Sequence, residues 1–175
     1  MTKTLIIFSS TDGHTQKICS RLQQEIGSHE HDVTIVSIDN TKTIDLHAFD
    51  KIVIGASIRY GKHSKSVYEF IKGNQALLKN KSNAFFSVNL VARKAEKCNP
   101  ETNPYLQKFL KEISWQPNEM AIFAGKVEYQ KYNFIDRNMI RFIMWMTKGP
   151  TDPKSNIEFT NWSQVESFGQ TIRDM

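Results

Sequence analysis

Small hydroxyl side chains and one glycine directly follow a short apolar stretch near the N-terminus. Residues 4–8 are mostly apolar and partly β-branched, which is typical of a buried strand in a parallel sheet. They lead into the run SSTDGHT at residues 9–15, where Gly13 gives a turn conformational room. From Thr15 onward the pattern is that of a helix. Free backbone N–H groups and hydroxyl donors at a helix N-terminus favour phosphate binding, so the run predicts a phosphate loop.

The run lacks the glycine patterns of the best-known nucleotide sites, G-x-x-x-x-G-K-[ST] and G-x-G-x-x-G. A capped strand–helix turn that binds nothing is the alternative interpretation. The run resembles the flavodoxin phosphate loop, T-x-T-G-x-T, which binds the phosphate of FMN, and Ser10, Gly13 and Thr15 match it in position. Asp12 departs from that pattern, since flavodoxins usually have a hydroxyl there and a carboxylate beside a phosphate is unfavourable. Capping of the following helix is one role open to Asp12.

The composition limits the class of protein. A chain of 175 residues is most simply one domain, residues 1–175, and two cysteines make no disulfide framework. No secretory signal and no run of 18 apolar residues occur, so we expect a cytosolic chain that does not span a bilayer. Five scattered histidines predict no metal site. The net charge is +5, whereas flavodoxin electron carriers are typically acidic. An anionic lipid, an anionic substrate or nucleic acid would suit this charge, as would an ordinary basic surface.

Strand and helix patterns alternate along most of the chain. Strands are predicted at 4–8, 33–38, 51–55, 84–90 and 120–124. Helices are predicted at 15–27, over one segment lined by Val67 and Leu78 despite Gly73, from about Thr102, and from the N-cap Asn161. The third of these should turn Tyr105, Phe109 and Ile113 inward. This alternation predicts a doubly wound parallel α/β sheet with right-handed crossovers. The resemblance to flavodoxins implies the flavodoxin-like strand order 2-1-3-4-5. Residues 126–153 do not continue this alternation of strands and helices and are interpreted as an insertion.

In such sheets ligands lie beyond the carboxyl ends of the strands, at the switch point between strands 1 and 3; flavodoxin is the standard example of this rule. Three loops should meet there, the first holding a phosphate and the other two flanking ribityl and ring. Tyr60 is expected to stack on the flavin or to be a surface tyrosine, and His14 to start a helix rather than to catalyse. The residues predicted to bind the cofactor are Ser10, Thr11, Asp12, Gly13, His14, Thr15, Ser57, Ile58, Arg59, Tyr60, Gly61, Ser87, Val88, Asn89, Leu90, Val91, Ala92, Arg93 and Gly125.

Longer blocks carry a more specific resemblance that covers essentially the whole chain. VIGASIRYGKHS at 53–64, FFSVNLVARK at 85–94, TNPY at 102–105, FIDR at 134–137 and a late TD resemble the menaquinone-dependent protoporphyrinogen IX dehydrogenase family of haem biosynthesis. The resemblance implies FMN as cofactor, protoporphyrinogen IX as reductant, and menaquinone or another quinone as acceptor. It also implies a peripheral place on the cytoplasmic face of the inner membrane. The alternatives are an NAD(P)H:quinone oxidoreductase and a flavodoxin electron carrier; a nucleic-acid binder fits least.

Cationic residues in the predicted loops suit the two propionates of a porphyrinogen, because arginine pairs well with carboxylates. The candidates are Arg59, Lys62, Arg93, Lys94 and Lys97, with a solvated charge run as the alternative. Cys98 is interpreted as a loop thiol and Cys19 as a helix-face residue. A porphyrinogen needs no acid–base group beyond flavin and solvent, so no catalytic residue is predicted.

The insertion contains one strongly apolar helical pattern. Ile135, Met139, Phe142, Ile143 and Met146 are expected to share one face of a helix over 134–146. The residues expected to widen that face are Ile140, Met144 and Trp145, with Arg137 and Arg141 on the polar side. Such a helix can lie in an anionic bilayer interface, pack over the flavin, or pack on the sheet as core. A homo-oligomer is a further expectation for such an apolar surface.

Overall fold

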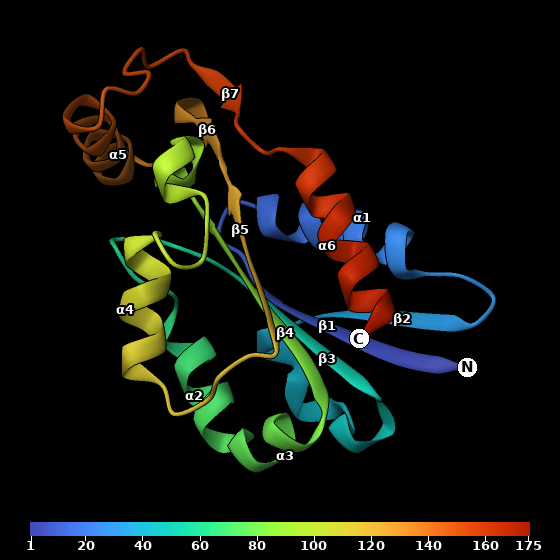
Figure 1. The fold of residues 1–175 in the computed structure, drawn as a ribbon. Coiled ribbons are helices and arrows are strands. Elements are labelled where there is room, and N and C mark those ends of the chain that lie inside the picture. Colours follow the sequence, from blue (N-terminus) through green and yellow to red (C-terminus); the bar gives the residue numbers. More distant parts are fainter.

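A five-stranded parallel sheet forms the centre of the computed structural model, which describes residues 1–175 (Figure 1). The strand order is β2-β1-β3-β4-β5, which confirms the predicted flavodoxin-like topology. The strands are β1 (Thr2–Ser9), β2 (His31–Ser37), β3 (Lys51–Ser57), β4 (Ser82–Asn89) and β5 (Glu119–Ala124). β1 and β3 are neighbours although β2 lies between them in the chain, so the switch point falls between them.

Helices cover both faces of the sheet in Figure 1. α1 and α6 pack on one face, and α2, α3 and α4 on the other. The helices are α1 (His14–Ile26), α2 (Lys65–Gly73), α3 (Gln75–Asn80), α4 (Pro104–Glu112), α5 (Phe134–Met146) and α6 (Trp162–Asp174). Short 3-10 turns lie at Ile38–Thr43, Leu46–Ala48, Leu90–Arg93, Ala95–Lys97 and Tyr129–Lys131.

Alternation along the strands divides the core into two layers. Leu5 and Ile7 point to the face covered by α2 and α4, while Ile6 between them points to α1 and α6. A strand whose successive side chains reach opposite faces, both of them covered, must be apolar throughout, as β1 is. The sheet is therefore buried on both sides, and its open, ligand-accessible part is the edge formed by the strand ends.

The single helix expected around Gly73 is wrong, because the structure has two. α2 ends at Gly73, and Asn74, with φ −118° and ψ 17°, separates it from α3. The Asn74 side chain donates to the Phe70 carbonyl over 2.8 Å, which satisfies a group left free at the helix end. α4 also ends earlier than expected, at Glu112, so Ile113 follows the helix although it still packs against the core.

The segment after β5 forms a small unit at the carboxyl end of the sheet (Figure 1). β6 (Lys126–Glu128) and β7 (Asn156–Glu158) pair antiparallel, and α5 lies between them in the chain. Val127, Tyr129, Tyr132 and Met144 form a buried cluster of their own beneath α5. None of the helices is long and apolar enough to cross a bilayer.

The N-terminal end of β3 is tied to the C-terminal end of the chain. Lys51 is 6% exposed, and its ammonium group donates to the carbonyls of Ile172 (3.0 Å) and Arg173 (2.7 Å) in the last turn of α6. Burial lowers the pKa of Lys51. The carbonyls at a helix C-terminus are unpaired and partly negative, so they are a suitable partner for this buried cation.

Candidate flavin site

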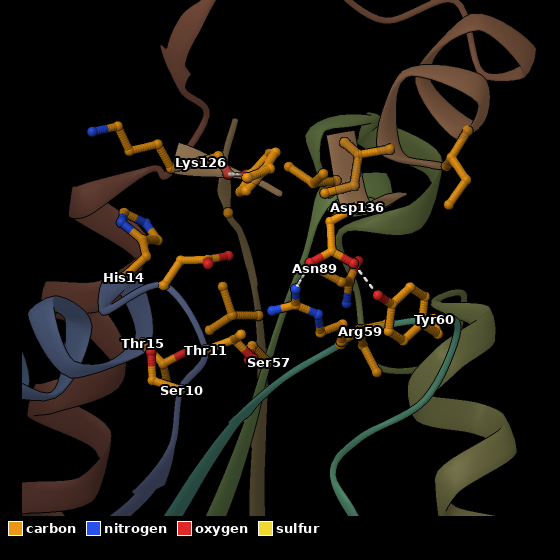
Figure 2. Close-up of a pocket in the computed structure, with 18 of the residues that line it drawn as sticks. Ser10, Thr11, His14, Thr15, Ser57, Arg59, Tyr60, Asn89, Lys126 and Asp136 are labelled. Carbon is orange, nitrogen blue, oxygen red and sulfur yellow. Dashed lines mark hydrogen bonds and ion pairs between the residues drawn. The ribbon is translucent and has the colours of Figure 1, made fainter. Parts of the chain in front are cut away.

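A cavity of about 150 Å³ lies beyond the carboxyl ends of β1, β3 and β4, and α5 covers one side of it (Figure 2). The loops that follow these three strands all line it, as the switch-point rule predicts. Its lining residues are Ser10, Thr11, Asp12, His14, Thr15, Ser57, Ile58, Arg59, Tyr60, Gly61, Val88, Asn89, Leu90, Val91, Tyr105, Gly125, Lys126, Glu128, Lys131, Tyr132, Asp136, Met139, Ile140 and Ile143.

The loop after β1 presents donors to this cavity. Gly13 is in the left-handed region, with φ 82°, and forms the N-cap of α1 without any side-chain cap. Its N–H donates to Ser10 Oγ over 3.0 Å, which closes the loop. The N–H groups of the next residues, at the start of α1, have no partner inside the helix. These donors, together with the hydroxyls of Thr11 and Thr15, fit an anionic group such as a phosphate.

Asp12 does not cap α1, so the capping role considered for it is wrong. It lines the cavity instead, and no hydrogen-bond donor within the protein faces its carboxylate. Partial burial raises its pKa, the charge of Arg59 opposes that effect, and Asp136 reinforces it. The phosphate loop thus carries a carboxylate whose charge disfavours a bound anion.

His14 fixes the phosphate loop to the chain that follows β7. Its Nε2 lies 2.6 Å from the hydroxyl of Thr160, and that hydroxyl donates to the Ala124 carbonyl over 2.6 Å. Since the single hydroxyl proton is used there, His14 Nε2 must donate to Thr160. Burial lowers the pKa of His14, which keeps the ring neutral at pH 7. His14 is the first residue of α1, as expected, and its role is to position the loop.

A tight turn after β3 projects Arg59 and Tyr60 toward the cavity mouth. Arg59 and Lys62 face each other in a short antiparallel bridge, with Arg59 N–H donating to the Lys62 carbonyl over 3.0 Å. Tyr60 (φ 52°) and Gly61 (φ 78°) both adopt left-handed conformations at the tip. A tyrosine held there is strained, and such strain persists only where the surroundings fix it. Tyr60 remains 55% exposed.

Asp136 of α5 holds these two side chains (Figure 2). Its carboxylate is 2% exposed and accepts hydrogen bonds from Arg59 Nη2, from the Tyr60 hydroxyl and, over 2.9 Å, from Asn133 Nδ2. Its own N–H donates to Asn133 Oδ1 over 2.8 Å, so Asn133 is the N-cap of α5 and Asp136 lies in the first turn. The Tyr60 hydroxyl and the Arg59 guanidinium hold the pKa of Asp136 below its usual range.

The loop after β4 rests on a buried polar network. Asn89 Oδ1 accepts hydrogen bonds from the Ala92 N–H (3.1 Å) and from Asn103 Nδ2 (3.2 Å). In the same network, Ser87 Oγ lies 2.9 Å from His63 Nε2. Burial lowers the pKa of His63 to about 3, so this ring is neutral. Ser87 and Ala92 were predicted to bind the cofactor, but neither lines the cavity. They support Asn89, which does.

Arg93 is the clearest departure from the predicted site. Instead of lining the cavity it donates to the Leu90 carbonyl (2.9 Å) and to the carbonyl and hydroxyl of Thr147 (2.9 and 2.8 Å). Thr147 is the C-cap of α5. Arg93 therefore does not line the cavity as expected, because its guanidinium anchors the end of α5, and its role in binding propionates stays a prediction. Lys62, Lys94 and Lys97 also lie outside the cavity lining.

By their spacing along α5, Ile135, Met139, Phe142, Ile143 and Met146 lie on one side of the helix, as expected, but that side is largely exposed. Met144 is buried, and Ile140 and Ile143 line the cavity together with Met139. Other large apolar side chains point away from the protein and are exposed: Phe134, Ile135, Phe142, Trp145 and Met146. Apolar side chains thus surround most of the helix, which covers the cavity with one side and presents an unpaired apolar surface with the other.

The structure thus gathers most of the predicted site residues, apart from Gly13, Ser87, Ala92 and Arg93. The lining residues missed from sequence come from the start of α4 and from the insertion: Tyr105, Lys126, Glu128, Lys131, Tyr132, Asp136, Met139, Ile140 and Ile143. Of these, Tyr105 and Asp136 lie in the TNPY and FIDR blocks. Anion donors at one end and mixed aromatic, aliphatic and amide groups at the other fit the phosphate and ring of a flavin mononucleotide.

Residues 5–154 match the family model described as "Flavodoxin domain". The chain is 41% identical over 170 residues to "Protoporphyrinogen IX dehydrogenase [quinone]" of Escherichia coli (strain K12), covering 97% of this chain and 94% of that protein. A protein of the same name from Leishmania major is 39% identical over 167 residues, covering 95% and 72% of the two chains.

Solved flavodoxins share the fold at low sequence identity. A flavodoxin from the domain Archaea matches with a TM-score of 0.58 and 16% identity, covering 99% of this chain and 97% of the other. Oxidised flavodoxin 1 of Bacillus cereus matches with a TM-score of 0.56 and 16% identity, covering 99% and 98%. Such likeness establishes the architecture. The match to the flavodoxin domain implies a flavin as cofactor.

Proposed function

This chain belongs to the flavodoxin-domain family of quinone-dependent protoporphyrinogen IX dehydrogenases, and we propose that it uses FMN to oxidise protoporphyrinogen IX and to reduce a quinone. The observation that carries the proposal is the cavity at the strand ends, in which a phosphate loop and two further loops meet beside Tyr60. A bound flavin takes up two electrons from a carbon donor and delivers them to a quinone, while the protein supplies position and electrostatics.

FMN, rather than FAD, fits the residues present. The loop at the start of α1 offers one set of anion donors, and the chain has no dinucleotide fingerprint. The remaining lining residues, such as Tyr60, Asn89 and Leu90, suit a ring and a ribityl chain. Release of the cofactor from purified protein, followed by chromatography, should yield FMN. FAD, or no flavin, would overturn the proposed cofactor.

Electron flow separates the proposed enzyme from its rivals. Under anaerobic conditions protoporphyrinogen IX should bleach the flavin absorbance, and a menaquinone analogue should restore it. NADH and NADPH should bleach the flavin absorbance much more slowly than protoporphyrinogen IX does. Rapid bleaching by a nicotinamide without a response to the porphyrinogen would favour an NAD(P)H:quinone oxidoreductase. A response to neither would favour an electron carrier.

We also propose that the exposed side of α5 docks peripherally on an anionic bilayer, at the cytoplasmic face of the inner membrane. Phe134, Phe142 and Trp145 are 72%, 56% and 69% exposed, and the ring centroids of Phe142 and Trp145 are 6.1 Å apart. So much exposed aromatic surface on one helix is unusual on a protein facing only water. Residues 126–148 carry three more cations than acids. Each cation near an anionic surface contributes about 1 kcal/mol, and apolar burial adds roughly 25 cal/mol per Å².

Vesicle binding tests this docking. The protein should sediment with anionic vesicles at low salt, should be released at high salt, and its tryptophan fluorescence should shift to the blue. Trp145→Phe should abolish most of the shift, whereas Trp115→Phe should preserve it, because Trp115 is fully buried. A wild-type protein that ignores anionic vesicles would refute membrane docking. If sedimentation velocity then showed a dimer that Trp145→Ser dissociates, a second copy would be the occupant of this surface.

A further inference from the structure

Two hydrogen-bond donors at the cavity mouth converge on one carboxylate. Arg59 Nη2 donates to Asp136 Oδ2 and the Tyr60 hydroxyl donates to Asp136 Oδ1 (Figure 2). A planar guanidinium beside a phenol hydroxyl, one on each oxygen, is a complementary receptor for a carboxylate of any origin. Both donors come from the loop after β3, in the sheet domain, whereas the carboxylate comes from α5.

The donors are accessible from solvent and the carboxylate is not. The side chain of Arg59 is 35% exposed and Tyr60 is 55% exposed, whereas the side chain of Asp136 is 3% exposed. The receptor therefore opens outward at the cavity mouth, with Asp136 on its inner side. A ligand that approaches the mouth meets Arg59 and Tyr60 before any other part of this cluster.

Other cations near the cavity are already engaged. Arg93 is bonded to the end of α5, and Lys126 and Lys131 pair with Glu128 at 3.0 and 3.1 Å. Arg59 is the one arginine among the residues that line the cavity. If Arg59 exchanged its partner, Asp136 would keep the hydrogen bond from Asn133 Nδ2 and its place in the first turn of α5, where the helix dipole favours a negative charge.

We propose that Arg59 and Tyr60 form the binding site for a carboxylate of the substrate, and that Asp136 occupies this site in its place until the substrate arrives. This inference rests on the proposed function, in which the substrate is a porphyrinogen with two propionates. One propionate replaces Asp136 as the partner of Arg59 and Tyr60. Arg59 and Tyr60 line the cavity and are also accessible from solvent, so a tetrapyrrole that meets the flavin at the mouth reaches this receptor.

The test compares binding of the stable porphyrin product in two forms that differ only in their carboxylates. Flavin-loaded protein is titrated with protoporphyrin IX and with its dimethyl ester in the same detergent buffer, and porphyrin fluorescence is followed. The wild type should bind the diacid about tenfold more tightly than the ester. Arg59→Gln should bind both forms at the level of the ester, because the charged donor is gone. Lys65→Gln, which removes an exposed charge on α2, should behave as the wild type.

Asp136→Asn distinguishes a replaceable partner from a permanent brace. If Asp136 competes with the propionate, the asparagine variant should bind the diacid severalfold more tightly than the wild type and the ester equally well. Weaker binding of both forms by this variant would mean that Asp136 braces the loop, and would overturn the inference. So would a wild type that binds diacid and ester alike. If the wild type bound neither form and left protoporphyrinogen IX unoxidised, the proposed function itself would fail.

Discussion

Replacing Asp12 by asparagine tests the electrostatics of the phosphate loop. The carboxylate lines the cavity beside the start of α1, and its pKa is raised by partial burial, an effect that the charge of Arg59 opposes. The other charged groups that face it are Asp136, Lys131 and Glu128. A phosphate bound at the loop adds negative charge and raises the pKa of Asp12 further. Binding of FMN should therefore take up a proton.

Coulomb's law sets the size of the effect. Two like unit charges roughly 6 Å apart repel by about 3 kcal/mol at an effective dielectric of about 20. Solvent at the cavity mouth and the nearby guanidinium of Arg59 reduce this to about 1–1.5 kcal/mol, which is roughly tenfold in the dissociation constant. Because binding of FMN takes up a proton, the affinity for FMN should fall as the pH rises. Affinity is strongest when Asp12 is protonated, and weakens as pH rises through the pKa of Asp12 in the complex.

The pH dependence of FMN affinity is measured by titrating flavin-free protein with FMN from pH 5 to 9 and following flavin fluorescence. Asp12→Asn should bind FMN about tenfold more tightly than the wild type above pH 7, and this difference should shrink as the pH falls. The phosphate of FMN titrates in the same way for both proteins, so its titration cancels in the ratio of their dissociation constants. Riboflavin, which lacks the phosphate, should show no difference between the two proteins. An asparagine variant that binds FMN no better than the wild type at pH 8 would refute the argument.

Further substitutions test other parts of the structure. Thr15→Ala should weaken FMN binding by about 1–2 kcal/mol and leave riboflavin binding unchanged; equal affinity for FMN would put the phosphate elsewhere. Arg93→Ala removes three hydrogen bonds around the end of α5 and should lower stability to denaturant by about 2–3 kcal/mol, of which Arg93→Lys recovers less than half; unchanged stability would mean that this anchor is weak. Gly55→Ala places a methyl group 2.1 Å from the ring of Phe86 and should cost at least about 1–3 kcal/mol, seen as a lower melting temperature, whereas Gly73→Ala meets nothing within 4 Å and should be neutral or stabilising.

Local patterns were sufficient to predict most of the fold. The apolar spacing of Val165, Phe168 and Ile172 after the N-cap Asn161 correctly located α6, because all three residues are buried against α1 and the sheet. Alternation of strands with helices indicated a doubly wound parallel sheet, and the resemblance to flavodoxins supplied the strand order. The break after α2 was missed because it depends on the side chain of Asn74 rather than on apolar spacing.

The site was predictable where it follows directly from a strand end. The residues after β1 and β3 line the cavity as expected. Arg93 was misassigned because its partner, Thr147, lies 54 residues away, and no spacing rule reveals such a contact. Asp136 was noticed only as part of a resembling block. Its partners Arg59 and Tyr60 belong to a loop more than 75 residues earlier, so only the folded chain shows why a carboxylate stands there.

The contact between Lys51 and the last turn of α6 also bears on how the protein is made. β3 lies at the middle of the sheet, yet the buried ammonium at its first residue obtains its partners only from Ile172 and Arg173, near the end of the chain. A chain emerging from the ribosome therefore completes the sheet around a cation that still needs water. Closure of α6 should be a late event in folding, because α6 follows all five strands of the sheet in the sequence. A nascent chain lacking the last few residues should stay sensitive to proteases near β3.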